Sequence, residues 1–207
     1  MSTKDILYDV PVSNHGARVR IILKEKGLKN YVEIKSPQDI GRSNTIISIR
    51  RKFIINSLNI PGGLKSETYL SLNPQGKMPL FLADGEFPIP ESDSICRYLT
   101  EKYKSMGSTF ISTDLKRQSL SDQICRIHDI YISPIQGCMY RAPGSKFSAF
   151  GTDRKAALNE LKHQLQIIEK LIDSTEISKG NFLCGDEISL AGSKYTIILI
   201  CPLSSSL

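Results

Sequence analysis

Two serines stand where a strand-like segment changes into a helix-like one, and a hydroxyl there can act on a negatively charged ligand. Ser13 follows the apolar stretch Ile6–Pro11 and precedes a helical pattern that begins at His15. Ser92 lies in the acidic, hydroxyl-rich helix start Glu91–Ser94. Unpaired backbone N–H groups and the helix dipole attract anions at helix N-termini. Serine is also a common helix cap, so a purely structural role is the alternative for both residues.

The hydroxyl of Ser13 is suited to stabilising a thiolate. A generic cysteine thiol, with a pKa of about 8.5, is mostly protonated at neutral pH. A hydrogen bond to a charged group contributes about 1.5–3 kcal/mol, and one pKa unit corresponds to about 1.4 kcal/mol. One such bond and the helix dipole would together lower the pKa of a bound thiol by about one to two units. Asn14 is a second donor in the same loop.

The segments around these serines predict a strand–helix–strand unit followed by a hairpin and a closing helix. Gly27 suits a helix stop, and Asp84-Gly85 is a strong hairpin signal. The expected strands are Ile6–Pro11, Tyr31–Lys35, Met78–Ala83 and Glu86–Ile89, the longer helices begin at His15 and Glu91, and Leu64–Leu72 is a short helix or turn. This β-α-β, then β-β-α order predicts an α/β fold for the first half of the chain.

From Asp114 onward the strand patterns mostly vanish, and the pattern becomes helical. Gln118–Ser133 is amphipathic with Pro134 as a point for a kink, Ala142–Gly151 has the composition of a loop, and Asp153 caps a helix that runs to about Asp173. The last of these carries apolar residues on one side, as expected of a helix that packs against a core. We therefore expect an all-α second half, with the boundary near Tyr103–Thr113.

The composition is that of an ordinary globular protein, with 40% hydrophobic and 23% charged residues among 207. No apolar run reaches the length of about 18 residues needed for a membrane span, and the N-terminus lacks a secretory pattern. A cytoplasmic location with no membrane partner is the expectation. Five scattered cysteines without metal-ligand spacing predict reduced thiols, mostly in the core, and no metal site.

The net charge of +6 is concentrated in two segments. Residues 42–61 contain three arginines and one lysine without any acid, and residues 193–207 add Lys194. The rest of the chain is close to neutral, and so it carries no basic field for a polyanion. Nucleic acid is therefore not an expected partner.

Three motifs in register resemble the glutathione transferase family of the serine type, with phi-, tau- and zeta-like character. The segment VSNHGARVRI at 12–21, followed by KEKG, resembles the family's active-site segment. LNPQGKMP at 72–79 resembles its "NPxGKVP" segment, and PESDSI at 90–95 resembles "xESxxI". The resemblance covers about Ile6–Tyr103. It implies a dimeric cytosolic detoxification enzyme with a thioredoxin-like glutathione-binding domain at 1–105 and a helical domain at 113–207.

The resemblance assigns a role to each candidate residue. Ser13 becomes the catalytic hydroxyl that activates the glutathione thiol, with Asn14 as fallback donor. Pro79 becomes a cis-proline beside Met78, whose backbone pairs with the cysteinyl backbone of glutathione as an added strand would. A trans-proline at a strand edge is the alternative.

The remaining ligand contacts are assigned to charged and hydroxyl side chains. Ser92 meets the γ-glutamyl carboxylate while Glu91 attracts the ammonium group, against the alternative of a capped helix start. Lys77 either meets the glycine carboxylate or is a solvated surface lysine, and Arg18 is interpreted as structural. Candidates for the pocket of the electrophile are Tyr131, Met139, Tyr140 and Phe147, although such residues usually belong to a core.

The family pattern is interrupted twice. RSNTIISIRRKFIINSLNIP and flanking residues, at 42–62, separate Gly41 from Gly63, where the family segments would join directly. Near the end, GDEISLAG resembles the family's "GDxxSxAD", but Gly192 replaces the aspartate of a helix capping box. The tail SKYTIILICPLSSSL then stands in place of further helices. We hypothesise that both segments are translated introns, the second ending at a stop codon. A lineage-specific loop and a short C-terminus are the alternative.

The expected reaction is the conjugation of the glutathione thiolate to small hydrophobic electrophiles, with glutathione as the co-substrate. A maleylacetoacetate isomerase type is a weaker alternative because its usual Ser-Ser-Cys run is absent, and thiol-disulfide chemistry lacks a cysteine at position 13. A non-catalytic module that binds glutathione or a protein is the alternative from another class. The damaged C-terminal half favours that module, and the retained motifs argue against it. A homodimer is expected if the helical domain is intact.

Overall fold

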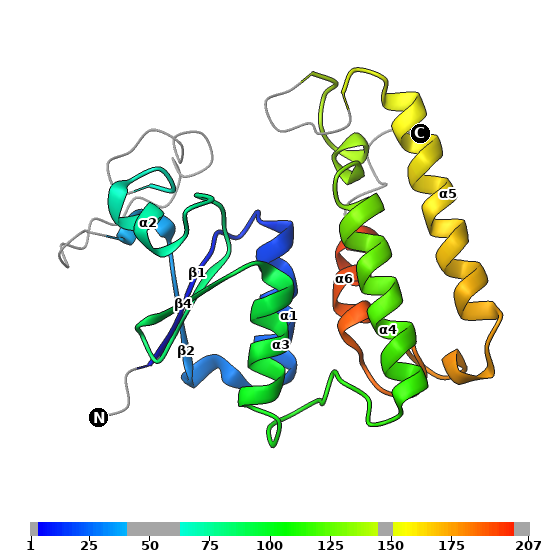
Figure 1. Ribbon diagram of the computed structural model, residues 1–207, viewed down its shortest axis with the longest axis horizontal. Coiled ribbons are helices and arrows are strands. Elements are labelled where there is room, and N and C mark those ends of the chain that lie inside the picture. Colours follow the sequence, from blue (N-terminus) through cyan, green and yellow to red (C-terminus); the bar gives the residue numbers. More distant parts are fainter. Residues whose placement is uncertain (1–3, 41–62, 145–150, 201–207) are drawn as a thin grey trace. The chain divides into compact units, whose positions relative to one another are not determined.

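The computed structural model describes residues 4–40, 63–144 and 151–200, and divides the chain into two compact units, Met1–Gly107 and Ser108–Leu207 (Figure 1). The first unit is built on a four-stranded sheet with the strand order β2-β1-β3-β4. β1 (Asp5–Tyr8) pairs in parallel with β2 (Val32–Lys35) and antiparallel with β3 (Leu80–Ala83), and β3 continues through a hairpin into β4 (Phe87–Pro90). This is the mixed sheet expected of a thioredoxin-like fold, and the predicted α/β class is confirmed.

Helices cover both faces of this sheet because side chains alternate along β1. α1 (Asn14–Glu25) and α3 (Ser92–Lys102) lie side by side on one face, and the short α2 (Glu67–Leu72) lies on the other (Figure 1). Buried side chains of both sheet and helix form the core on the α2 face: Tyr8, Ile40, Tyr69, Leu80 and Leu82. The connections η1 (Leu28–Asn30) and η2 (Pro37–Asp39) are single 3-10 turns.

Local signals in the sequence identified the turns of this unit correctly. Gly27 follows the last residues of α1 with a φ of 69°, the left-handed conformation that suits glycine. Asp84 and Gly85 both have positive φ at the β3–β4 turn, as predicted for a tight hairpin. The first three strands are shorter than predicted, and β4 is displaced by one residue from the predicted Glu86–Ile89. β1 ends at Tyr8 rather than Pro11, because the chain turns from Asp9 into the loop before α1.

The second unit consists of helices, as predicted. α4 (Leu115–Ile127) begins three residues before the predicted start, because the Asp114 side chain accepts hydrogen bonds from the N–H groups of Lys116 and Arg117 at 2.8 and 3.1 Å. A π-helical turn, η3 (His128–Ile132), extends it, and the 3-10 turn η4 (Gln136–Met139) follows. α5 (Arg154–Asp173) begins at the predicted cap Asp153, whose side chain accepts from Ala156 N at 2.9 Å. η5 (Glu176–Ser178) precedes the last helix.

The last helix, α6 (Leu190–Ile200), corrects one expectation for the C-terminal tail. The tail was expected to stand in place of the family's further helices, yet residues 193–200 continue α6. The serine half of the capping box is retained, since Ser189 Oγ accepts from Gly192 N at 3.2 Å, and no proline interrupts the chain before position 202. Lys194 is buried and its Nζ lies 2.6 Å from Asp129 Oδ2. The other interruption, 42–62, lies outside the described residues.

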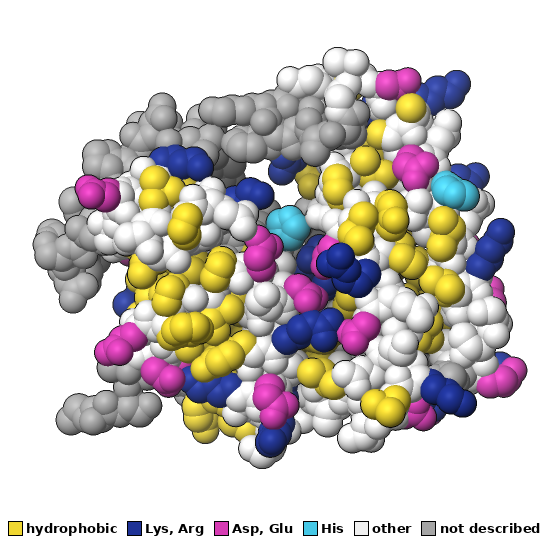
Figure 2. All heavy atoms as spheres, viewed as in Figure 1, with side chains coloured by type: hydrophobic (Ala, Val, Ile, Leu, Met, Phe, Trp, Pro, Cys, Tyr) yellow, Lys and Arg dark blue, Asp and Glu magenta, His cyan; other side chains and the backbone are white. Residues whose placement is uncertain are grey.

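The thiols and surface charges of the described residues fit the expectations from composition. Four cysteines are free and buried, which confirms their interpretation as core residues: Cys96, Cys125, Cys138 and Cys184. Cys201 lies outside the described residues. Figure 2 shows acidic and basic side chains interspersed on the face in view. The described residues contain no cluster of three or more potential metal ligands and no helix with the length and hydrophobicity to cross a membrane.

Asp5 joins the start of β1 to the end of α3 and to the hairpin. Its side chain is 1% exposed and accepts hydrogen bonds from Lys102 Nζ at 2.8 Å, Tyr103 Oη at 2.7 Å and Asp84 N at 2.7 Å. The ion pair offsets the cost of burying a carboxylate only while all these donors are in place. Asp5 therefore has a structural role. It lies at the N-terminal end of β1, whereas Ser13 follows the C-terminal end of this strand.

Asp5→Ala is expected to lower the free energy of unfolding by about 3 kcal/mol, because removal of one partner of a buried pair leaves the other donors unsatisfied. Urea unfolding of the parent and the variant measures this difference. Glu101→Ala, which removes an exposed carboxylate paired only with exposed Lys104, is the matched control and should unfold with the parent. Equal midpoints for Asp5→Ala and the parent would contradict the structural role of Asp5.

Candidate active site

Three loops that carry the predicted site residues leave the sheet at the same edge. Tyr8 pairs with Leu80, and Leu80 pairs with Pro90 on the next strand. The segment that follows Tyr8 leads to Ser13, and the one before Leu80 contains Met78. The segment after Pro90 begins with Glu91. The register of three adjacent strands therefore brings these separate stretches of sequence to one edge.

Ser13 is the N-cap of α1. Its Oγ accepts a hydrogen bond from Gly16 N at 3.0 Å, and its backbone is extended, as expected for a cap. A serine hydroxyl accepts through its lone pairs and donates through one proton, so the cap leaves the donor function available. The half-buried Asn14 is the first residue of the helix. The capping alternative is thus a real feature of Ser13, compatible with the role of donor.

The loop before β3 exposes a backbone edge at Met78. The Met78–Pro79 peptide bond is cis, as predicted. The carbonyl of Lys77 accepts from Tyr69 Oη at 2.6 Å and from Asn73 Nδ2 at 2.8 Å, which fixes the loop from below. Burial raises the pKa of Tyr69, so its hydroxyl stays protonated and able to donate. Among the described residues, the backbone N–H and carbonyl of Met78 have no hydrogen bond, and both can pair with an extended ligand.

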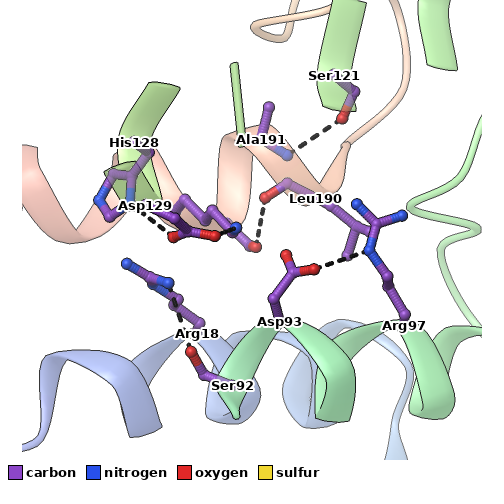
Figure 3. Close-up of polar contacts among 11 residues, drawn as sticks. Arg18, Ser92, Asp93, Arg97, Ser121, His128, Asp129, Leu190 and Ala191 are labelled. Atoms are coloured by element: carbon purple, nitrogen blue, oxygen red, sulfur yellow. Dashed lines mark hydrogen bonds and ion pairs between the residues drawn. The ribbon is translucent and has the colours of Figure 1, made fainter. Parts of the chain in front are cut away.

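Glu91 and Ser92 form the start of α3. Glu91 has a φ of 69°, and its Oε1 accepts from Gln75 Nε2 at 3.2 Å, which links it to the Met78 loop. Ser92 is 5% exposed, and Arg18 Nη1 on α1 donates to its Oγ at 3.4 Å (Figure 3). The guanidinium and the helix N-terminus together favour a carboxylate at Ser92. Arg18 was interpreted as structural from the sequence, and the contact with Ser92 was missed.

Comparisons with known proteins agree with this geometry. The family model for the glutathione S-transferase N-terminal domain matches residues 7–107. Glutathione S-transferase F10 of Arabidopsis thaliana is 27% identical over 149 residues, which cover 70% of this chain and 68% of that protein. Glutathione S-transferase 3 of Zea mays is 26% identical over 196 residues, which cover 93% of this chain and 75% of that protein. Residues 7–107 of this chain therefore belong to the glutathione S-transferase N-terminal domain family.

Solved structures of the family show the same fold. Glutathione transferase F7 from Populus trichocarpa has a TM-score of 0.69 at 22% identity, covering 97% of this chain and 84% of that chain. Glutathione transferase F2 from the same organism has a TM-score of 0.67 at 23% identity, covering 94% and 80%. The resemblance that the three motifs indicated is confirmed at the level of the family. Serine-type chemistry at Ser13 stays a prediction.

The candidates for the electrophile pocket belong to the second unit. Tyr131 lies in the π-helical turn and Tyr140 follows η4, and these side chains are 51% and 41% exposed. Met139 is half-buried, and Phe147 lies outside the described residues. Lys77, beside the Met78 loop, is exposed, so both of its predicted roles are compatible with its position.

Sequence patterns gave no signal for the buried carboxylate of Asp9, which lies immediately before the Ser13 loop. Its side chain is 1% exposed and forms an ion pair with Arg20 on α1. Burial raises the pKa of Asp9, while the charge of Arg20, the Val10 N–H and the hydrogen bond from Arg20 oppose that rise. Asp9 falls at the end of an apolar strand, and only the geometry reveals its proximity to Ser13.

Proposed function

We propose that this chain transfers the glutathione thiolate to an electrophilic carbon of small hydrophobic substrates. The observation that carries the proposal is the convergence of Ser13, Met78 and Ser92 on one sheet edge, in a chain whose residues 7–107 belong to the glutathione S-transferase N-terminal domain family. Each of the three provides a different contact, and a γ-glutamyl tripeptide with a thiol at its centre requires all of them.

Glutathione binds along the sheet edge in an extended conformation. Its γ-glutamyl carboxylate meets Ser92, where the N-terminus of α3 and the Arg18 guanidinium attract negative charge. Glu91 attracts the ammonium group. The cysteinyl backbone pairs with the N–H and carbonyl of Met78, and Lys77 is close to the glycine end. The cysteinyl sulfur then faces the start of α1, where Ser13 and Asn14 lie.

The chemical step is attack by the thiolate. Ser13 Oγ–H donates to the sulfur, and the thiol proton leaves to water, because the hydrogen bond favours the charged form. The sulfur lone pair forms the new S–C bond while the leaving group, or the π electrons of an activated double bond, takes the electron pair released at carbon. Ser13 therefore acts through the ionisation of bound glutathione and forms no covalent bond itself.

Two measurements on the purified chain test this function: retention on immobilised glutathione and the rate of conjugation of a generic aryl halide. Retention together with conjugation supports the transferase. Retention without conjugation favours the non-catalytic glutathione-binding module, and absence of both would overturn the proposal. Isomerisation of maleylacetoacetate in the absence of aryl halide conjugation would favour the isomerase alternative.

The proposed organisation has a glutathione-binding domain at 1–105 with an insertion at 42–62, and an incomplete helical domain at 113–207 that forms a homodimer if it is intact. We propose a cytoplasmic location for this enzyme. Transcript reads across the two interruptions test the hypothesis of translated introns, and uninterrupted reads through both segments would reject it. Sedimentation of the purified chain tests the dimer, and a monomer that still conjugates would reject any need for one.

A further inference from the structure

One guanidinium holds the whole loop that leads to Ser13. Arg20, on the second turn of α1, pairs with the Asp9 carboxylate through Oδ2. The same guanidinium donates to the backbone carbonyls of Val10 at 3.2 Å, Pro11 at 3.0 Å and Ser13 at 3.4 Å. Four of the five residues from Asp9 to Ser13 therefore share a single donor, and movement of Arg20 would move the hydroxyl that faces glutathione.

Asp9 lies directly beneath the first turn of α1. A Cβ added to Gly16 would come within 1.9 Å of Asp9 Oδ1, so only glycine allows the carboxylate to occupy this place. Asp9 is 4% exposed, and its Oδ1 has no hydrogen-bond partner among the described residues. Ser13 Oγ accepts from the N–H of this same Gly16 at 3.0 Å, so the carboxylate and the hydroxyl both lie against Gly16. A buried anion with unused acceptor capacity thus lies next to the proposed catalytic hydroxyl.

The charged and titratable groups around Asp9 come from three elements. Arg20 on α1 is its ion-pair partner. On β2 the carbonyl of Lys35 accepts the Asp9 N–H at 3.0 Å, and the Lys35 side chain pairs with Glu33. On α2 the charge of Asp9 contributes to the raised pKa of Tyr69. Arg20 is thus the cation that partly neutralises Asp9.

The buried Asp9 carboxylate and the Ser13 hydroxyl both lie at the first turn of α1. When glutathione bound beside Ser13 ionises, its thiolate and the Asp9 carboxylate are two negative charges close to this turn. Like charges at this range disfavour ionisation of the second group. The Asp9 charge therefore opposes the stabilisation that Ser13 supplies.

We propose that Asp9 and Arg20 tune the thiol chemistry without touching glutathione: Arg20 fixes the loop that presents Ser13, and the buried charge of Asp9 opposes the ionisation of glutathione bound beside Ser13. The inference rests on the proposed function and adds a restraint to it. With Asp9 charged, bound glutathione ionises at a higher pH than it would if only Ser13 and the helix N-terminus acted on its thiol. No covalent step is added, and the thiol proton still leaves to water.

Asp9→Asn tests the effect of this charge, because it removes the charge and keeps the shape. Arg20 stays bonded to three carbonyls in this variant, so its charge also favours the thiolate. The midpoint for ionisation of bound glutathione, followed by thiolate ultraviolet absorbance, should fall by about one pH unit. The pH profile of kcat/KM should move by the same amount. An unmoved midpoint would reduce Asp9 to a structural group, and a shift to higher pH would make it a proton acceptor. Either result overturns the proposal.

Glu101→Gln provides the matched control for charge. It also removes one carboxylate from the first unit, but Glu101 lies near the C-terminal end of α3 and pairs with exposed Lys104. In this variant, the midpoint for ionisation of bound glutathione should equal that of the parent. A shift as large as that of Asp9→Asn would show that net charge, and not the position of Asp9, sets the midpoint, and this would also overturn the proposal.

Arg20 variants test the positioning role separately. Arg20→Met should lower kcat about tenfold while the KM for glutathione changes less than twofold, because the misplaced hydroxyl weakens the chemical step rather than binding. Arg20→Lys keeps a donor and a charge and should recover part of kcat. Unchanged kcat in Arg20→Met, or a change in KM alone, would overturn this part of the inference. Parent activity and its loss in Ser13→Ala report on the proposed function itself, so failure of that function is distinguished from failure of these variants.

Discussion

Ser13→Ala should lower the kcat for conjugation of an aryl halide by about 10- to 150-fold, the rate equivalent of losing a hydrogen bond to a thiolate worth about 1.5–3 kcal/mol. The ionisation midpoint of bound glutathione should rise by about one to two pH units in the same variant. Initial rates at saturating glutathione, together with thiolate absorbance against pH, measure both effects. A variant as active as the parent would remove Ser13 from catalysis.

The structure requires a control for the cap, because Ser13 Oγ also accepts from Gly16 N at 3.0 Å. Loss of an N-cap alone costs about 1 kcal/mol of stability and could disturb the loop. Ser13→Gly separates the two roles. Glycine at a helix N-cap costs only about a few tenths of a kcal/mol relative to serine, and it has no hydroxyl proton to donate. This variant should therefore melt close to the parent and conjugate as poorly as Ser13→Ala. High activity in Ser13→Gly would show that the cap is what matters at this position.

Asn14→Ala tests the second candidate donor in this loop. Asn14 is the first residue of α1 and was the second donor considered in the sequence. If Ser13 is the donor, Asn14→Ala should keep most of the parent rate. A larger loss in Asn14→Ala than in Ser13→Ala would assign the hydroxyl's proposed role to the amide.

The order of elements and the fold could be predicted because their signals are local. Gly27, Asp84-Gly85 and Asp153 act through their own backbone conformation or through a bond to a residue three positions away. Such interactions depend on neighbours in sequence, and a single chain displays them. The same holds for the three motifs, which carry the turns and helix starts of the family in compact form.

Contacts between distant residues were the part that the sequence could not provide. Arg18 and Ser92 are 74 positions apart. The spacing of apolar residues along α1 does not indicate which of its side chains contacts α3. Lys26 is a second example. A lysine next to a helix stop is expected on the surface, but it is 1% exposed and donates to the carbonyls of Tyr103 and Met106 at 3.0 and 2.9 Å. Burial lowers its pKa.

The tail illustrates the opposite error, in which family likeness outweighed local physics. The tail after Gly192 was interpreted as standing in place of the family's further helices. Ser189 still accepts from Gly192 N, however, and half of a capping box is enough to start a helix whose sequence contains no breaker before position 202. Departure from the family pattern at Gly192 therefore does not by itself prevent a local helix from forming there.

Ser92→Ala should raise the KM for glutathione about tenfold and leave kcat within about twofold of the parent. In the proposed pose, Ser92 holds the γ-glutamyl carboxylate beside the Arg18 guanidinium, and this carboxylate takes no part in the reaction at sulfur. An interaction present equally in the ground and transition states changes KM and not kcat, and a loss of about 1.4 kcal/mol corresponds to a factor of ten. Steady-state kinetics with varied glutathione and saturating aryl halide measures the two constants separately.

Ser94→Ala is the matched control, because Ser94 lies in the same first turn of α3 but is exposed. Its KM should equal that of the parent. If both alanine variants raised KM equally, the effect would come from a weakened helix start. If neither did, the carboxylate would bind elsewhere. A rise in KM for Ser92→Ala alone would place the γ-glutamyl group at the N-terminus of α3. The distance from there to Ser13 would then define where the sulfur must lie. The two predictions together test a single extended pose of glutathione along the sheet edge.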